Sequence, residues 1–286
     1  MTLLSCLIAT AGLLQNSPAV IIGAMIVAPL MTPILAFSLG VIWGDTQLIK
    51  KSFGSIIKGA LLAVLISGTL SFFVPIAEYT SEILARTKPN LFDIVVAISS
   101  GLVGAYGNAN KKISNTLVGI AIAVALMPPL CTIGIGLGNF DWPVARGAIM
   151  LYSINLISIS LAGAIVFWVM KIHPKSEEKE KVKRRALSQI IISIILLIAI
   201  AIPVGIYTYS TFKLEHAKKA VWKIAKENFS DDLFTIQFIE KQTKFDVIIT
   251  VLSIKADEDK FKHASTLIKR QHPDFNTVKI KFIKTE

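Results

Sequence analysis

Long apolar runs separated by short polar loops extend from the N-terminus to about residue 209. Seven runs can be marked, and most of them exceed the roughly 18 residues that a helix needs to cross a bilayer. They lie at 2–14, 18–45, 54–76, 91–106, 113–138, 144–170 and 190–209. The pattern predicts an α-helical integral membrane protein with about seven apolar segments. The short first segment either spans the bilayer or is re-entrant.

The pattern changes after residue 210, where charged residues mix with short periodic segments. Apolar residues recur at helical spacing, alternate in two segments, recur at helical spacing again and alternate once more. These segments lie, in chain order, at 214–224, 234–238, 245–251, 261–268 and 278–282. The order helix, strand, strand, helix, strand predicts a small soluble α+β (αββαβ) domain whose sheet has one buried face.

Four regions follow from these patterns. A membrane domain covers 1–170, a basic linker 171–188, an additional transmembrane helix 189–210 and the soluble α+β domain 211–286.

The run at 18–45 carries no charge before its last residue and yet contains Pro29 and Pro33 near its middle. Proline lacks a backbone N–H and interrupts a helix. Membrane proteins place such broken segments where the backbone opens onto a cavity. The run at 113–138 contains Pro128 and Pro129 in the same way. Both runs are expected as proline-broken helices, and a kink satisfied by a neighbouring helix is the alternative.

These two proline-containing runs resemble each other when one is shifted by 96 residues. The uncommon residues match, and they pair Leu30 with Leu126, Met31 with Met127, Pro33 with Pro129, Gly40 with Gly136 and Asp45 with Asp141. The helices that follow match with one residue of slip. We therefore predict two three-helix repeats, 1–76 and 91–170. Because each repeat has an odd number of helices, the second enters the membrane from the opposite face, as in inverted-repeat transporters.

The charged loops predict an orientation. Lys50 and Lys51, Lys111 and Lys112, and the basic linker all fall on one side if all seven runs cross the membrane. The positive-inside rule then places the N-terminus and the linker in the cytoplasm. The C-terminal domain is expected on the extracytoplasmic side.

The composition agrees with a membrane protein: the chain is 53% hydrophobic and 17% charged. The net charge of +11 does not indicate nucleic-acid binding, because the basic residues lie in loops and in the tail. Cys6 and Cys131 both fall in apolar runs, and the four histidines lie in the linker or tail without metal-ligand spacing. We expect no metal, no cofactor and no enzymatic activity, because no catalytic motif is present. The lipid bilayer is the partner that the composition implies.

Polar residues and prolines at the ends and centres of the two related runs are the candidate substrate or ion pathway. They are Asn16, Ser17, Pro29, Pro33, Asn115, Thr116, Pro128 and Pro129. Exposed N–H groups at a helix start bind anions or polar ligands, and carbonyls freed by proline bind cations or water. Ordinary capping at the membrane surface is the alternative for the polar residues. No carboxylate lies in the middle of a run, which disfavours a carboxylate proton relay.

Two pairs of glycines four residues apart permit close helix packing: Gly40 with Gly44, and Gly134 with Gly138. These glycine faces are also compatible with homo-oligomerisation.

The string NSPAVIIGAMIVAPLMTPILAFSLG resembles a family of prokaryotic membrane proteins of unknown function, the uncharacterised hydrophobic domain family. The resemblance extends from about Leu3 to Met170 and includes Gly119 to Pro129. It implies a multi-pass protein of the prokaryotic cytoplasmic membrane. Members often carry a soluble region before the membrane domain, so either an N-terminal region is missing here or this chain is a short member of the family. The family implies no substrate.

Two functions fit these features. The first is a membrane transporter or channel for a small solute or ion, with a site between the two broken helices near the membrane midplane. The second is a non-transporting membrane sensor or scaffold whose C-terminal domain binds a partner or lipid head groups.

Overall fold

The computed structural model describes residues 1–74, 78–110 and 113–172, short stretches between 188 and 226, and residues 233–241, 244–253, 258–271 and 275–284. The chain divides into two compact units, 1–208 and 209–286. The predicted linker lies almost entirely outside the described residues, whereas the described residues of the predicted seventh apolar segment, 190–209, are helical.

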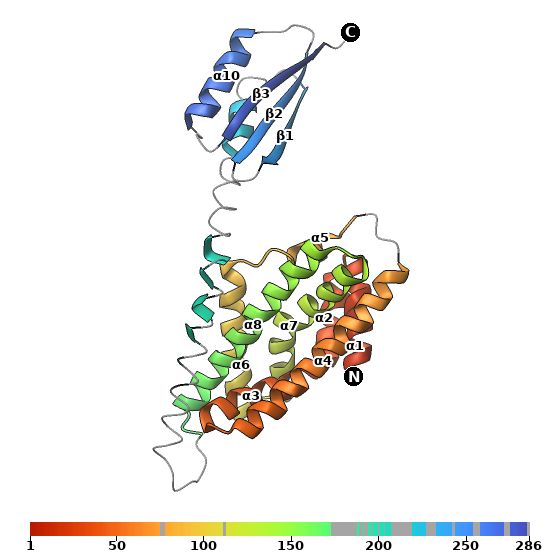
Figure 1. Cartoon of the computed structure of the whole chain (residues 1–286), viewed down its shortest axis with the longest axis vertical. Coiled ribbons are helices and arrows are strands. Elements are labelled where there is room, and N and C mark those ends of the chain that lie inside the picture. Colours follow the sequence, from red (N-terminus) through yellow and green to blue (C-terminus); the bar gives the residue numbers. More distant parts are fainter. Residues whose placement is uncertain are drawn as a thin grey trace. The chain divides into compact units, whose positions relative to one another are not determined.

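The first unit is helical (Figure 1). Its helices are α1 (Thr2–Leu14), α2 (Pro18–Val27), α3 (Met31–Trp43), α4 (Thr46–Phe73), α5 (Ser81–Ala85), α6 (Leu91–Ala109), α7 (Asn115–Gly138) and α8 (Trp142–Val169). Four of the described helices, α4, α6, α7 and α8, are long and apolar enough to cross a membrane. Helices α2 and α3 pass the same test together and are bent by 61° at their break, which is the geometry of a broken span or of a re-entrant loop. These apolar helices indicate a membrane-embedded protein.

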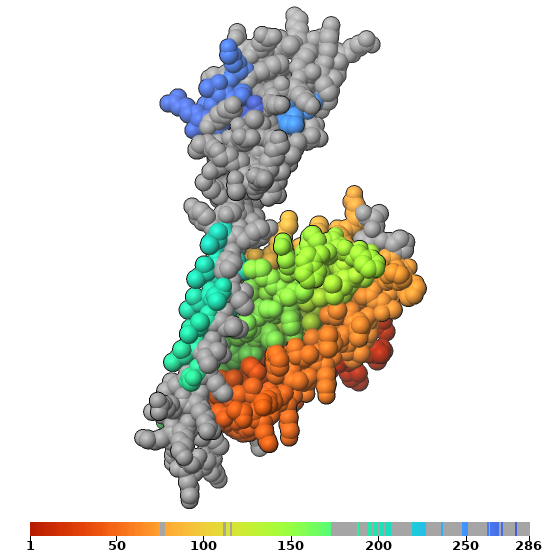
Figure 2. Space-filling model, viewed as in Figure 1, coloured from red at the N-terminus to blue at the C-terminus, as the bar shows by residue number. Residues whose placement is uncertain are grey.

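Helix α7 lies at the centre of this unit and packs against α1, α2, α4, α6 and α8. Its most apolar window is 78% buried, whereas that of α4 is only 22% buried. The outward side of α4 presents Ile57, Leu61 and Leu65, which recur every four residues and are exposed. Figure 2 shows α4, in orange, at the surface of the unit. An exposed apolar face of this length suits contact with lipid tails.

The prediction of two proline-broken helices is half wrong. Residues 28–30 separate α2 from α3, but α7 continues as one helix through Pro128 and Pro129. A proline at position 129 removes the N–H that would bind the Ala125 carbonyl. The Asn155 side chain on α8 donates to that carbonyl instead, at 2.7 Å. A neighbouring helix therefore satisfies the freed carbonyl, which is how membrane helices tolerate proline.

The second unit contains β1 (Leu233–Lys241), β2 (Lys244–Ser253), α10 (Glu258–Gln271) and β3 (Phe275–Lys284). Its sheet has the order β1-β2-β3, with β1 antiparallel and β3 parallel to β2. The parallel pair requires a crossover, and α10 forms part of it. Ala264 and Ile268 of α10 are buried, as are Ile249 of β2 and Val278 of β3. One face of the sheet is therefore covered by a helix.

Candidate functional site

The break between α2 and α3 begins at Pro29, whose missing N–H ends the hydrogen-bond ladder of α2. Pro33 lies in the first turn of α3, where N–H groups have no partner within the helix, so it disturbs nothing. The last carbonyls of α2 need other donors. The Ala24 carbonyl accepts from the Ser5 hydroxyl of α1 at 2.7 Å, and the Met25 carbonyl accepts from the Ala28 N–H at 3.3 Å.

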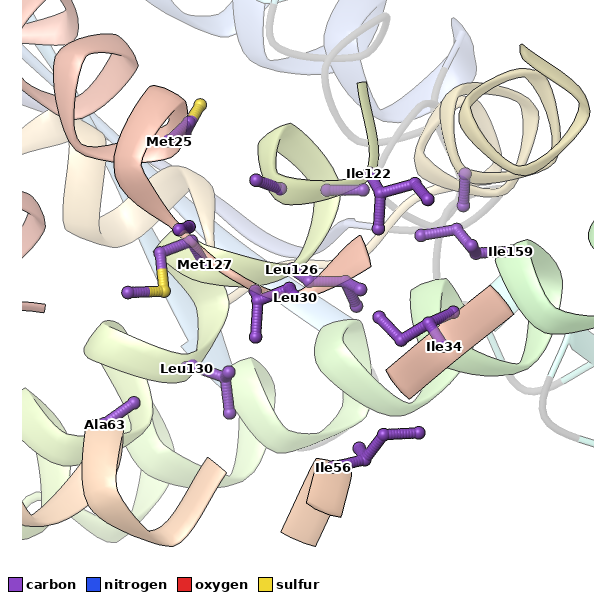
Figure 3. Packing of buried hydrophobic residues seen from close by; sticks show 14 of the residues in the cluster. Met25, Leu30, Ile34, Ile56, Ala63, Ile122, Leu126, Met127, Leu130 and Ile159 are labelled. Atoms are coloured by element: carbon purple, nitrogen blue, oxygen red, sulfur yellow. The ribbon is translucent and has the colours of Figure 1, made fainter. Parts of the chain in front are cut away.

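This break lies against the middle of α7. Both α2 and α3 contact α7. Figure 3 shows Leu30, from the break, beside Leu126 and Met127 of α7, and all three belong to one buried cluster. The break thus reaches the same turn of α7 whose carbonyl is bound by Asn155. The centres of three segments meet in one layer of the bundle.

Polar groups concentrate on α8 in that layer. Asn155 is 4% exposed and Ser158 is fully buried. Within the described part of the chain, the Asn155 Oδ1 and the Ser158 and Ser160 hydroxyls have no hydrogen-bond partner. The sequence analysis did not choose these residues as a site because each is an isolated polar residue within an apolar run. Their signal was the spacing of polar residues within 144–170.

Two serine–glycine contacts join α3 to α8 and α4 to α7. The Ser38 hydroxyl of α3 donates to the Ser160 carbonyl of α8 at 3.0 Å, and a Cβ at Gly163 would lie 2.9 Å from the Ser38 hydroxyl oxygen. On the other side, a Cβ at Gly134 of α7 would collide with the Ser67 hydroxyl and lie 2.5 Å from the Val64 carbonyl of α4. At each of these two helix crossings, the serine hydroxyl fills the space that a side chain at the facing glycine would need.

The predicted polar residues lie away from the proline layer. Asn16 is exposed in the turn before α2, and its side-chain oxygen accepts from the Ser81 hydroxyl and the Glu82 N–H at the start of α5. Ser17 is the N-cap of α2 without a side-chain cap bond. Helix geometry separates this turn from the break by about 15 Å. Asn16 therefore orders a loop, and the eight pathway residues do not form one cluster.

The start of α7 likewise differs in detail from the prediction. Ser114 is the N-cap, and its hydroxyl accepts from the Thr116 N–H at 3.3 Å. Asn115 is the first helical residue, and Thr116 is exposed. They stand about 20 Å along the helix from Pro128 and Pro129.

The four predicted packing glycines have different roles. A Cβ at Gly138 would collide with the Gly68 carbonyl of α4, so Gly134 and Gly138 form a helix contact as expected. Gly40 contacts the first turn of α4, where a Cβ would lie 3.1 Å from the Ile49 nitrogen. Gly44 has a φ of 63° and ends α3 in the left-handed conformation. Gly44 is therefore required by the turn, because side chains rarely adopt that conformation.

Both cysteines are free and buried in the described structure. The Cys131 thiol of α7 is directed to the Cys6 carbonyl of α1 at 3.9 Å. The two cysteines therefore lie in the contact between α1 and α7.

The comparison with known proteins gives two matches. Residues 25–161 match the model of the family described as "Domain of unknown function (DUF389)". An uncharacterised protein of the archaeon Methanocaldococcus jannaschii is 31% identical over 201 residues, which cover 70% of this chain and 62% of that protein. The chain thus spans less than two thirds of that relative's length. The resemblance to an uncharacterised prokaryotic family is confirmed, and neither match names a substrate.

Proposed function

Since residues 25–161 match the model of the DUF389 family, whose function is unknown, we propose from the geometry of this chain that it is a membrane transporter or channel for a small solute or ion. The observation that carries the proposal is the layer in which the α2–α3 break meets the centres of α7 and α8. Irregular backbone at membrane depth is tolerated where it is buried in protein or lines a cavity. Unpartnered polar side chains in the same layer favour the second of these roles.

The proposed architecture is a pair of inverted repeats, with α1 to α4 in the first and α6 to α8 in the second. The turn geometry supports it. The Asp45 N–H donates to the Gly40 carbonyl at 3.0 Å, and 96 residues later the Asp141 N–H donates to the Gly136 carbonyl at 2.8 Å. Each aspartate then caps the next helix with its side chain.

The serine–glycine contacts support the same repeat. Adding 96 to Ser38 gives Gly134, and adding 96 to Ser67 gives Gly163. The contact of Ser38 with Gly163 therefore has its counterpart in the contact of Gly134 with Ser67. Such reciprocal contacts are the signature of a two-fold relation between like parts. Both contacts favour a constant shift of 96 residues over the one-residue slip of the sequence match.

Transport is tested in proteoliposomes with a panel of small ions and uncharged solutes. We expect the wild-type protein to carry at least one of them, and the double variant Pro33→Ala with Pro129→Ala to change that flux at least several-fold. Pro18→Ala is the matched control, because Pro18 is an exposed residue in the first turn of α2. Absence of any wild-type flux would refute the function. A flux that the double variant leaves unchanged, in folded protein, would refute the role of the prolines.

A second candidate is a sensor or scaffold that does not transport, and the separate compact unit 209–286 favours it. In that case the C-terminal domain binds a protein partner or lipid head groups. Deleting 211–286 distinguishes the two functions. Wild-type flux retained by the shortened protein supports the transporter, whereas a phenotype lost with an intact membrane unit supports the sensor.

A further inference from the structure

Unpartnered polar atoms are concentrated in one short stretch of α8. Three buried side-chain atoms have no hydrogen-bond partner among the described residues, and all three lie between Asn155 and Ser160. A buried polar group without a partner costs about 1–3 kcal/mol, so native structures contain few of them. Three within six residues call for a binding role or bound water.

The serines of this stretch also depart from the usual behaviour of hydroxyls in helices. Serine and threonine inside a helix commonly donate to the carbonyl four residues back. Ser67, Thr132 and Ser153 do so, at 2.6, 3.0 and 2.8 Å. The Ser158 hydroxyl is as buried as those of Ser67 and Thr132, and it makes no such bond. It is therefore available to a ligand.

The Asn155 amide is fixed in orientation. Its nitrogen donates to the Ala125 carbonyl, which Pro129 deprives of its helical donor. If the amide were flipped, its oxygen would lie 2.7 Å from the Ala125 carbonyl oxygen and the two would repel each other. The Asn155 Oδ1 therefore points away from Ala125 and acts as a hydrogen-bond acceptor. Asn155 and Ser158 are three residues apart, which places them one turn apart on one helix face, with Cβ atoms about 5–6 Å apart. Both can therefore bind the same small molecule.

The chemistry of the interior selects an uncharged ligand. The buried polar side chains of the described residues are Ser5, Thr10, Ser38, Ser52, Ser67, Ser71, Ser100, Thr132, Asn155, Ser158 and Ser160. All carry hydroxyl or amide groups and none carries a charge. An ion without a counter-charge at membrane depth costs several kcal/mol, whereas hydroxyl and amide groups match a neutral hydrogen-bonding molecule.

We propose that Asn155 and Ser158 bind water, or an uncharged polar solute of similar size, near the middle of α8. The site rests on the proposed function in one respect: it makes a small neutral solute the class that is carried. Asn155 accepts a hydrogen bond from the ligand, and Ser158 donates to it or accepts from it. Ser160 lies on another side of α8, beside Ser38, and is not part of this pair.

Cysteine reactivity tests whether water reaches the site. In a Cys6→Ala, Cys131→Ala background we compare Ser158→Cys with Ser67→Cys, which replaces a serine that is equally buried but fully bonded. Only a thiolate reacts with methyl methanethiosulfonate, and a thiolate forms only where water is present. We expect Ser158→Cys to react at least about tenfold faster than the control, with the anionic sulfonatoethyl reagent failing to react at either position. Equal rates, or no reaction at either position, would overturn the site.

Two further measurements keep the test decisive. Adding Asn155→Leu should slow the reaction of Ser158→Cys, because the apolar side chain removes the acceptor that holds water. In the Cys6→Ala, Cys131→Ala background without further substitution, hydroxyl-radical labelling at residues 156–159 should exceed labelling at the buried stretch 130–133, and equal labelling would contradict the proposal. The flux assay tests the transporter separately. If the thiol of Ser158→Cys reacts but the wild-type protein shows no flux, the transporter is refuted and the site stands. If the wild-type protein shows flux but the thiol does not react, only the site is refuted.

Discussion

The bond between Asn155 and the Ala125 carbonyl predicts an energetic coupling between Asn155 and Pro129, two residues that need not touch. In the wild-type protein, Asn155→Leu leaves the carbonyl without a donor. In a Pro129→Ala background, the restored N–H at position 129 can bind the same carbonyl, so the loss of Asn155 matters less. The substitution also removes the unpartnered amide oxygen, but this gain is the same in both backgrounds and cancels.

The size of this coupling can be bounded. An orphaned buried carbonyl costs about 1–3 kcal/mol, and hydrogen bonds measured inside membrane proteins average about 0.6 and reach about 1.7 kcal/mol. The bond is short, at 2.7 Å, and both partners are buried. We therefore expect Asn155→Leu to cost about 1 kcal/mol more in the wild type than in the Pro129→Ala background.

The assay is a double-mutant cycle of reversible unfolding in mixed micelles, followed by the loss of helical circular dichroism. Ser153→Ala is the control, because its hydroxyl bonds within α8 and should show no coupling to Pro129. Equal costs of Asn155→Leu in the two backgrounds, within about 0.3 kcal/mol, would refute the idea that Asn155 replaces the missing donor.

Three other outcomes are expected. Gly134→Ala should destabilise the protein by about 1–3 kcal/mol, because the added Cβ collides with α4. Gly119→Ala is the control, because a Cβ at that position meets no atom within 4 Å. Equal unfolding free energies of the two variants would contradict the close packing. Ser5→Ala should cost about 1 kcal/mol because the Ala24 carbonyl loses its donor, and an unchanged unfolding midpoint would contradict this. Burial and the negative charge of Asp141 raise the pKa of Tyr79 to about 12. The folded chain keeps this proton above pH 10, where the unfolded chain releases it, so stability falls between about pH 10 and 12. Ultraviolet titration of the phenolate checks the shift, which Asp141→Asn should reduce while keeping the helix cap; a wild-type midpoint at about 10 would contradict it.

The hydropathy pattern predicted the bounds of a helix well where burial or membrane contact extends over the whole segment. The apolar runs at 113–138 and 144–170 end within two residues of α7 and α8. The start of α4 was missed by eight residues, because its first turns are polar and Asp45 caps them. Hydropathy marks the part of a helix that meets lipid or core, whereas capping marks where the helix begins.

The response of each helix to its prolines was beyond local reasoning. Pro29 ends α2, whereas Pro128 and Pro129 leave α7 continuous. The difference depends on a donor at Asn155, which no window around the prolines contains. The same limit explains why the polar atoms of α8 were not chosen as a site: whether a hydroxyl bonds within its own helix is decided by neighbouring helices.

The two serine–glycine crossings also bear on how the proposed repeat arises by duplication. Ser38 faces Gly163, and Gly134 faces Ser67. If the second half were a copy of the first, each crossing would place serine against serine, and the Cβ at position 134 would have no room. If the first half were a copy of the second, both crossings would have two glycines and a gap. Identical halves could form a serine–glycine pair at both crossings only with serine at one of the two positions and glycine at the other, whereas here both serines lie in the first half and both glycines in the second.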